Sequence, residues 1–577
     1  MNNKSILMTL GHNSSVIFYD GINKPLGFEE ERLTGKKSDS SFPKNAIEKI
    51  IEFVGNELEG ATVYISHWFD TFDIESFPDK YYNHKAMDEL CRVFSLKIVT
   101  LNSNFTHHDA HAYSSKAFVE NFQRVSKDTL FIVADGFGNN KEVLSFYKPN
   151  TSGLELIDRV YGFKNSLGLL YQYATSYCGM KENQDEYKFL GYESNILNVL
   201  TEKSQLDVVN KHVEIYKDNF ISKFIYNFLN AKIVTSTNNS YLDIEDLMET
   251  KKYIHEFIDM VLNAVKAVSQ ANRIEYIINE SSTRTIVGYF IQACLEKCIV
   301  AIITYYNYEN VVLSGGCFMN VKLNKKVLDT VRGTISVNPL CGDQGAAIGL
   351  YHYTTGCSFD YADLCFGRRK HSYSELVRLR SIVITNPNVI QTTEHDFVEV
   401  VSKLIKDDFI VNIVRNDMEF GPRALCNTST LAIPSKENVK YINMINNRNE
   451  VMPMAPVTTA DLAEMFMKSE DLERVIGSNK FMIITHDFDS EVLLSGHSGV
   501  VHNKPLDGGY TCRPQILDEN DYEMNQIVIN SPMLCLINTS FNTHGNPILY
   551  SLTQILYDFQ NQYKLDYDNR VKLVIQL

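Results

Sequence analysis

One pattern occurs twice in this chain and constrains its fold more than any other feature: an apolar strand leads into a glycine-containing turn. The first copy spans residues 6–21, with Gly11 in its turn and a second strand behind it. The second copy begins at residues 129–134 and has Gly136 in its turn. Apolar runs bounded by glycine are typical of strands. Two such units indicate a duplicated half-domain, and we predict an α/β fold with two related halves.

A histidine pair precedes the second copy, in the run Phe-Thr-His-His-Asp-Ala-His-Ala at residues 105–112. If this run is helical, His107 and His111 lie one turn apart on the same face and can bind one metal ion. A histidine pair alone is as often a surface coincidence as a ligand set. Asp135 after the second strand and Asp343 in a later glycine turn can supply two carboxylates. Imidazoles with carboxylates suit iron, manganese or zinc.

Two glycine-rich turns follow apolar stretches further along the chain, at residues 314–317 and 341–347. Small residues let the backbone approach a ligand closely. The first turn follows an apolar helical pattern at 286–303 and a short strand, an order that can place an adenosine against the turn. A simple turn would not need so many small residues in a row. The predicted nucleotide contacts are Gly136, Ser314, Gly315, Gly316 and Asn320.

A further set of polar residues lies in the C-terminal part of the chain. Pro422 fixes the turn before Arg423, whose guanidinium can bind a pair of phosphate or carbamate oxygens. Ser540 and Asn542 are two apart on an extended segment, so their side chains point to the same side. These residues are candidates for binding an anionic substrate.

Length and charge limit the organisation of the chain. Its 577 residues exceed a single ordinary core, and we expect a first domain at 1–360, a linker at 361–395 and a second domain at 396–577. With 55 basic and 70 acidic residues the net charge is −15, which argues against nonspecific binding to nucleic acid. A basic cluster at 368–380 is interpreted as a solvated connection, with a nucleic-acid contact as the open alternative. Residues 200–250 form an insertion of unassigned role.

Neither secretion nor a membrane is indicated. The N-terminal segment lacks the apolar core of a signal peptide, and no later segment reaches the length of a membrane span. We therefore expect a cytoplasmic protein without a membrane partner. The eleven cysteines are scattered singly, without a C-x-x-C pair, which favours free thiols over disulfides or a thiolate metal site.

In their order and spacing, these segments resemble the O-carbamoyltransferases of the nodulation-factor and antibiotic-tailoring type over nearly the whole chain. No single motif decides this resemblance. The matching pieces are residues 11–15, 30–37, 42–43, 107–112, 135–136, 166–168, 314–320, 343–347, 421–425 and 539–542.

The resemblance implies an N-terminal domain with the duplicated actin-like ATPase fold, similar to the tRNA-modifying threonylcarbamoyltransferase, and a C-terminal α/β domain of the YrdC type. It also implies two steps. The C-terminal domain would convert carbamoyl phosphate and ATP into carbamoyl adenylate and pyrophosphate. The N-terminal domain would pass the carbamoyl group to an acceptor hydroxyl and release AMP. A divalent ion, iron before manganese or zinc, is implied at His107, His111, Asp135 and Asp343, where it would screen phosphate charge.

The resemblance also implies roles for single residues. His12 becomes a candidate general base, and the alternative is a turn histidine that only caps the strand end. Lys37, like Lys188, matches a lysine near the nucleotide, although a lysine on a loop is often only solvated. Arg423 completes the predicted catalytic set. The predicted contacts to carbamoyl phosphate are Arg448, Ser540 and Asn542.

Near this substrate site the chain departs from the family pattern. The family's Lys-x-Arg-Glu is represented by Asn446, Arg448 and Asn449, and Met452 stands where an arginine precedes the Pro-x-Ala-Pro motif. Each charge-assisted hydrogen bond contributes roughly 1.5–3 kcal/mol, so the lost charges should weaken phosphate binding. We expect a working but altered first step.

The acceptor is not encoded in any motif. A hydroxyl on a small molecule is the first expectation, and a hydroxymethyl pyrimidine in a nucleotide or in DNA is chemically equivalent. A noncatalytic nucleotide-binding scaffold and a tRNA threonylcarbamoyltransferase are further alternatives, and the oligomeric state is open, with a homodimer as one option. Retention of the four metal ligands favours an enzyme, and the order of the two domains favours O-carbamoylation.

Overall fold

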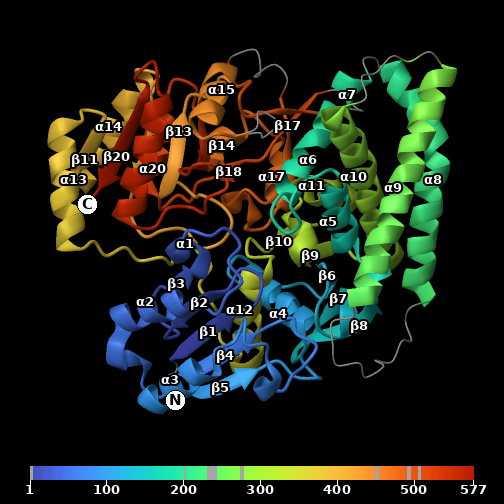
Figure 1. Cartoon of the computed structure of the whole chain (residues 1–577), viewed down its shortest axis with the longest axis horizontal. Coiled ribbons are helices and arrows are strands. Elements are labelled where there is room, and N and C mark those ends of the chain that lie inside the picture. The colour runs from blue at the N-terminus through green and yellow to red at the C-terminus, as the bar shows by residue number, and fades with distance from the viewer. Residues whose placement is uncertain are drawn as a thin grey trace.

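The computed structural model describes residues 4–200, 203–230, 244–272, 274, 279–448, 454–489, 496–504 and 509–577. Its N-terminal half contains two five-stranded sheets with equivalent strand orders (Figure 1). The first sheet, in the order β3-β2-β1-β4-β5, consists of β1 (Ser5–Thr9), β2 (Ser15–Tyr19), β3 (Leu26–Glu29), β4 (Thr62–Ser66) and β5 (Lys97–Thr100). The second sheet, in the order β8-β7-β6-β9-β10, consists of β6 (Thr129–Ala134), β7 (Glu142–Asn150), β8 (Gly153–Tyr161), β9 (Asn310–Ser314) and β10 (Ile335–Val337).

Both sheets repeat the same pairing. In each, the first three strands along the chain are antiparallel neighbours, and the last two run parallel to the first. β1 and β6 therefore occupy equivalent central places, and every residue of both is buried. The predicted α/β class and duplication are confirmed, and the arrangement is that of the actin-like ATPase fold.

Two helices at equivalent places pack together at the centre of this half. α4 (His107–Glu120) follows β5, and α12 (Ala346–Thr355) follows β10. They can approach closely because Gly349 has no side chain, since a Cβ there would lie 1.8 Å from the carbonyl oxygen of Ala110. The N-terminal ends of these two helices lie beside the ends of β1 and β6.

The remaining helices of the N-terminal half cover the two sheets. They are α1 (Glu30–Thr34), α2 (Lys44–Val54), α3 (His84–Phe94), α5 (Leu167–Tyr177), α6 (Glu186–Tyr192), α7 (Ile196–Val199), α10 (Glu280–Tyr306) and α11 (Val321–Thr330). By length and composition α10 could cross a membrane, yet 72% of its apolar window is buried inside the protein.

The predicted insertion, 200–250, contains α8 (Lys203–Asn230) and the beginning of α9 (Ile244–Ala271). These two long helices stand side by side at one edge of the molecule (Figure 1). α9 buries Ile254, Phe257 and Val261 at helical spacing. The pair packs on α5 and α10, so it extends the second half-domain outward.

The C-terminal half is built on a seven-stranded mixed sheet in the order β11-β20-β12-β13-β19-β14-β18. Its strands are β11 (Val389–Thr392), β12 (Ile410–Val414), β13 (Thr428–Ala432), β14 (Ala455–Thr458), β18 (Gln515–Ile516), β19 (Leu536–Ser540) and β20 (Val571–Gln576). A small sheet beside it contains β15 (His486–Phe488), β16 (His502–Asn503) and β17 (Tyr510–Cys512).

Alternating residues of the large sheet face two different helix layers. Ile410 and Val414 pack with α13 (Tyr373–Thr385), α15 (Lys436–Ile445) and α20 (Leu552–Leu565). Val411 and Ile413 pack with α14 (Glu394–Lys406) and α19 (Tyr522–Ile529). This alternation is the period of two expected for a strand between two layers. Two short helices, α16 (Ala460–Ala463) and α17 (Ser469–Arg474), complete this half.

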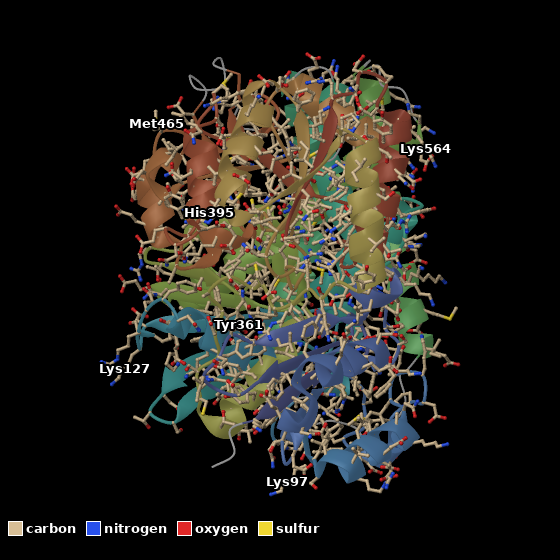
Figure 2. The ribbon with its side chains drawn as sticks, turned by 90° about the vertical axis from the view of Figure 1, so that its left-hand side faces the viewer. Lys97, Lys127, Tyr361, His395, Met465 and Lys564 are labelled. Carbon is tan, nitrogen blue, oxygen red and sulfur yellow. The ribbon has the colours of Figure 1, made fainter. Side chains whose placement is uncertain are left out.

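The segment expected as a linker, 361–395, is largely built into the C-terminal half. It contains α13 and β11, and Val389 of β11 pairs with Leu573 of β20. Leu379 of α13 is fully buried in the same core. Figure 2 shows the two halves stacked, with His395 and Lys564 in the upper one and Lys97 at the base of the lower one. Tyr361 lies between them, where its hydroxyl is 2.9 Å from Ser114 Oγ of α4.

Candidate active site

The four predicted metal ligands come together at the centre of the N-terminal half. His107 and His111 lie in the first turns of α4, Asp135 follows β6, and Asp343 lies just before α12. The two Nε2 atoms are 3.1 Å apart. His107 Nε2 is 3.5 Å from Asp135 Oδ2 and 3.4 Å from Asp343 Oδ1. His111 Nε2 is 3.7 Å from each of the same two oxygens.

This geometry fits a single divalent ion. Ligands about 2.1 Å from one ion lie roughly 3.0–3.4 Å apart in octahedral or tetrahedral geometry, close to the spacing seen here. Both imidazoles are buried. Burial opposes a charge on His107, but the carboxylates of Asp343 and Asp135 outweigh it and raise the pKa of His107 to about 10. The negative field at this point is therefore suited to a cation.

The second oxygen of Asp135 is held by a glycine turn. Asp135 Oδ1 accepts a hydrogen bond from the backbone N–H of Gly316, 3.0 Å away. Gly315 has a φ of +94°, and a Cβ there would lie 2.3 Å from the carbonyl oxygen of Ala134. The predicted nucleotide turn therefore needs glycine to pack against the end of β6, and this contact aims Asp135 at the two histidines.

Other predicted nucleotide contacts lie around the same place. Gly136 accepts a hydrogen bond on its carbonyl oxygen from Ser166 Oγ at 2.6 Å. Ser314 Oγ is buried and has no hydrogen-bond partner among the described residues. The side chain of Asn320 caps α11 by accepting from Leu323 N, and it also pairs with Gln292. Contact with a nucleotide remains a prediction for all of them.

His12 lies in the turn that follows β1. Its Nε2 is 3.4 Å from the carbonyl oxygen of Asn183, and the preceding Gly11 packs against the indole of Trp68. The end of β1 reaches the metal-ligand region, because Thr9 Oγ1 lies 3.4 Å from the carbonyl oxygen of Asp343. His12 follows Thr9 by only three positions in the sequence. Its role as a base stays a prediction.

A second charged site is a cluster of half-buried basic side chains, to which we give the name cationic pocket. Tyr187 bonds to one of them and lies near two others, and the fourth lies near Arg423. The four are Arg423, Arg448, Arg513 and Lys37. Among the described residues, none of the three arginines forms an ion pair with a carboxylate. Burial lowers the pKa of Arg448 to about 10, and burial together with the charge of Arg423 lowers that of Arg513 to about 9. Burial also lowers the pKa of Arg423. Positive charges held together without counter-ions indicate a site for an anion.

Hydrogen bonds fix the orientation of Arg448. Its guanidinium donates to Ser540 Oγ at 2.9 Å and to Asn542 Oδ1 at 3.0 Å, and it also contacts Thr539 Oγ1. Ser540 Oγ in turn donates to Asn542 Oδ1 at 2.7 Å. The structure therefore brings together the three residues predicted to contact carbamoyl phosphate.

The N-terminal half contributes to the cationic pocket through Lys37 and Tyr187. Lys37 Nζ is 3.3 Å from the hydroxyl of Tyr187, and burial lowers the pKa of Lys37 to about 8. Burial raises the pKa of Tyr187 to about 12, although the charges of Arg448 and Arg423 oppose this. Sequence reasoning missed Tyr187 and Arg513. Arg513 stands alone after β17, between a cysteine and a proline, and nothing local distinguishes it.

A buried ion pair joins the two halves at the turn that carries Arg423. Glu29 accepts hydrogen bonds from Gly421 N at 3.0 Å and from Arg32 Nε at 3.1 Å. Arg32 also donates to the carbonyl oxygen of Gly421. Gly421 has a φ of +97°, and a Cβ there would lie 2.6 Å from a methyl carbon of Leu340. This clamp of Glu29 and Arg32 therefore places the cationic pocket beside the loop that leads to Asp343.

The basic cluster at 368–380 is partly used inside the protein. Arg368 lies over the ring of Phe53, and Lys370 pairs with Glu52 at 3.3 Å. Arg369 is half-buried and donates to Tyr550 O and to Thr428 Oγ1. Arg378 and Arg380 are exposed on α13. The intramolecular partners reduce the charge available for nucleic acid, and a nucleic-acid contact stays untested.

Of the departures from the family pattern, Asn446 is fully buried and accepts a hydrogen bond from Gln562. Asn449 and Met452 lie outside the described residues. At Asn446, a neutral side chain is packed into the C-terminal core, and its Nδ2 has no hydrogen-bond partner among the described residues.

Together, the duplicated half and the mixed-sheet half form an α/β protein with a candidate metal centre beside a cluster of basic side chains. Residues 75–350 match the family described as Carbamoyltransferase N-terminus, and residues 402–571 match Carbamoyltransferase C-terminus. The chain therefore belongs to the carbamoyltransferase family and is a transferase. The predicted family resemblance is confirmed.

Relatives span the whole chain. An uncharacterised protein of Methanocaldococcus jannaschii is 26% identical and covers 97% of this chain and 96% of its own length. Nodulation protein NolNO of Sinorhizobium fredii is 21% identical, over 97% of this chain and 78% of its own. The 3'-hydroxymethylcephem-O-carbamoyltransferase of Amycolatopsis lactamdurans is 29% identical over 30% of this chain and 34% of its own. Among solved structures, full-length HypF in its phosphate- and nucleotide-bound form has a TM-score of 0.31 and 13% identity, covering 62% of this chain and 56% of its own.

Proposed function

We propose that this protein is an ATP-dependent O-carbamoyltransferase that makes carbamoyl adenylate from carbamoyl phosphate and ATP and transfers the carbamoyl group to an acceptor hydroxyl. The observation that carries this proposal is the cationic pocket, whose three arginines form no ion pair with a carboxylate among the described residues, next to the cluster of two histidines and two aspartates. One site suits phosphate groups and the other suits a divalent ion, and the proposed reaction needs both.

The cationic pocket supports the first step. Withdrawing a guanidinium from water without a counter-ion is costly. Among the described residues the three half-buried arginines have no carboxylate counter-ion, so anionic ligands that neutralise them are the proposed explanation. Arg448 is held by Ser540 and Asn542, so its planar fork is already oriented for a bidentate phosphate contact. In the proposed step, water hydrolyses carbamoyl phosphate to carbamate and phosphate. A carbamate oxygen then attacks the α-phosphorus of ATP, and pyrophosphate leaves.

The residues around α4 support the second step. The acceptor hydroxyl oxygen would attack the carbamoyl carbon while the bond to AMP breaks. His12 is the residue proposed to take the hydroxyl proton, which requires hydrogen-bond reach and a pKa near the working pH. A divalent ion at His107, His111, Asp135 and Asp343, iron first and manganese or zinc as alternatives, would polarise the carbonyl and screen phosphate charge.

The acceptor proposed for this reaction is a hydroxyl on a small molecule. The printed name of the Amycolatopsis lactamdurans relative describes transfer to such a hydroxyl in that protein. A cytoplasmic location, where ATP is available, is part of the proposal. A hydroxymethyl pyrimidine in DNA would instead require a salt-sensitive DNA complex that weakens when exposed Arg378 and Arg380 are neutralised.

The test is pyrophosphate release from ATP with Mg²⁺, with and without carbamoyl phosphate and with added Fe²⁺ or Mn²⁺. We expect release that depends on carbamoyl phosphate, and a loss of that release in Arg423→Ala but not in Arg378→Ala, which changes an exposed arginine on α13. Nucleotide binding without such release would overturn the proposal in favour of a noncatalytic scaffold. Unchanged release by Arg423→Ala would overturn the placement of the phosphate site.

A further inference from the structure

Behind the two metal-ligand histidines lies a buried ionic network that the proposed reaction does not use. Its centre is Glu142, the first residue of β7, whose side chain is 0% exposed, together with Arg159 of β8, whose side chain is 8% exposed. We call these residues and their partners Thr106, Asp109 and Tyr147 the Glu142 network. A buried charged network is costly unless every member is satisfied, so its presence calls for a role.

The Glu142 network holds the N-terminus of α4. Glu142 Oε1 accepts a hydrogen bond from the backbone N–H of His108 at 2.9 Å, and Asn139 Oδ1 accepts from that of His107 at 2.7 Å. Glu142 Oε2 accepts from Thr106 Oγ1 at 2.9 Å. The first N–H groups of a helix have no partner within the helix, and the helix dipole favours a negative charge there. The loop before β7 therefore supplies the missing acceptors.

Arg159 joins this loop to the other side of the helix. Its Nη1 lies 3.0 Å from Glu142 Oε2, and its Nη2 lies 2.7 Å from Asp109 Oδ1. Tyr147 donates its hydroxyl to the same Asp109 oxygen at 2.8 Å. Asp109 Oδ2 accepts from Thr106 N at 2.7 Å and so completes the cap of the helix. One guanidinium thus bridges two carboxylates, which a lysine cannot do with the same geometry.

The same loop also carries a metal ligand. Asp135 directly follows β6, the strand before the loop, and Glu142 begins β7, the strand after it. The loop lies directly against the helix, since a Cβ on Gly138 would be 2.7 Å from Glu142 Oε1 and 3.1 Å from His107 Cβ. A single short loop therefore supplies one carboxylate ligand. Its residues also accept the hydrogen bonds at the N-terminus of the helix that carries both imidazole ligands.

We propose that Glu142, with Arg159 as its counter-ion, is a positioning residue that fixes the helix bearing His107 and His111 relative to Asp135 and thereby sets the affinity for the divalent ion. This inference rests on the metal centre of the proposed function. Glutamine at position 142 could still accept from one N–H, but its amide nitrogen would face Thr106 Oγ1 or Arg159 and leave the guanidinium with Asp109 as its one remaining counter-charge in the network.

The test compares Mn²⁺ binding by wild type, Glu142→Gln and Arg159→Lys, measured from the loss of the free Mn²⁺ electron paramagnetic resonance signal. The control is Glu155→Gln, the same substitution on the same hairpin, where the side chain is 52% exposed. Changes to residues that orient metal ligands typically weaken metal binding about 10- to 100-fold. We expect such a loss in both network variants, with unchanged circular dichroism, and wild-type affinity in the control.

Pyrophosphate release separates this inference from the proposed function. Because the cationic pocket is not part of the Glu142 network, carbamoyl phosphate-dependent release should stay at wild-type level in Glu142→Gln. Wild-type Mn²⁺ affinity in a folded Glu142→Gln protein would overturn the inference alone. Absence of Mn²⁺ binding by the wild type would overturn the metal centre and the inference together.

A milder variant protects the test against misfolding. If Glu142→Gln does not fold, Tyr147→Phe removes only the hydroxyl that donates to Asp109 and leaves both buried charges in place. We then expect Tyr147→Phe to lose less Mn²⁺ affinity than Arg159→Lys does. Equal, wild-type affinities in these two variants would overturn the inference.

Discussion

The two charged sites of this protein are opposites. At the candidate metal centre, two carboxylates lie beside two histidines. The negative charge of Asp343 and Asp135 outweighs the effect of burial and raises the pKa of His107 to about 10. In the cationic pocket the basic side chains are half-buried, and among the described residues the three arginines form no ion pair with a carboxylate. Burial lowers the pKa of Lys37 to about 8 and that of Arg513 to about 9. The difference shows which ligand each site favours: a cation at the first site and an anion at the second. Four substitutions or conditions test this contrast.

Asp343→Asn should have the largest effect, because it removes half of the negative charge at the metal centre. Since changes outside the ligand set alone weaken metal binding about 10- to 100-fold, we expect Mn²⁺ affinity to fall by more than about 100-fold. Carbamoyl phosphate-dependent pyrophosphate release should persist. Mn²⁺ titration of this variant against Asp329→Asn, on the exposed side of α11, checks the result, and equal affinities would contradict a metal role for Asp343.

Arg513→Ala should affect only the cationic pocket. Loss of charge-assisted hydrogen bonds worth about 1.5–3 kcal/mol corresponds to an increase of roughly 10- to 150-fold in the KM for carbamoyl phosphate or ATP. Mn²⁺ binding should stay at wild-type level. Steady-state kinetics of pyrophosphate release measure the change, and a KM within twofold of wild type for both substrates would remove Arg513 from the pocket.

The pH dependence of the first step should depend on Lys37. Its folded-state pKa is about 8, below the usual value for lysine, so the ammonium is charged below pH 8 and loses its proton as the pH rises through 8. The KM for the anionic substrates should therefore rise between about pH 7.5 and 9. Lys37→Arg keeps its charge throughout and should flatten this rise. A wild-type profile that is already flat would contradict the assignment.

Ser540→Ala should have the smallest effect. It removes one hydrogen bond that orients Arg448 but leaves the contacts to Thr539 and Asn542. A loss of about 0.5–1.5 kcal/mol corresponds to a KM for carbamoyl phosphate raised roughly 2- to 12-fold. A drop in kcat with no change in KM would instead indicate that Ser540 contacts the reacting group.

Local pattern was enough to predict the duplicated half-domain and the metal centre. The strands at β1 and β6 are continuous apolar runs because both faces of each are covered, and the i,i+4 spacing of His107 and His111 defines a helix face. Asp343 was recognisable because its glycine turn follows a buried strand. These features each depend on residues close together in the sequence.

Features created by distant contacts were not predictable in the same way. Arg513 becomes part of the cationic pocket only because β17 is placed near Arg423, about ninety residues earlier in the chain. Leu379 is the only residue of α13 that is fully buried, and the N-terminal cap of this helix is formed by Ser372 and Glu375 at the surface. The sequence of α13 therefore resembles a solvated connection. The Glu142 network was missed because a single glutamate at a strand start has no pattern of its own.

The clamp of Glu29 and Arg32 on Gly421 has a consequence for synthesis of the protein. Its partners are separated by 392 and 389 residues, so the ribosome exposes the acidic and basic side chains long before the peptide they hold. At about 5–20 residues per second, this interval is roughly 20 to 80 s. During this interval Glu29 and Arg32, which are buried in the folded protein, remain exposed to water. The turn that carries Arg423 therefore reaches its final place only when nearly three quarters of the chain has been made.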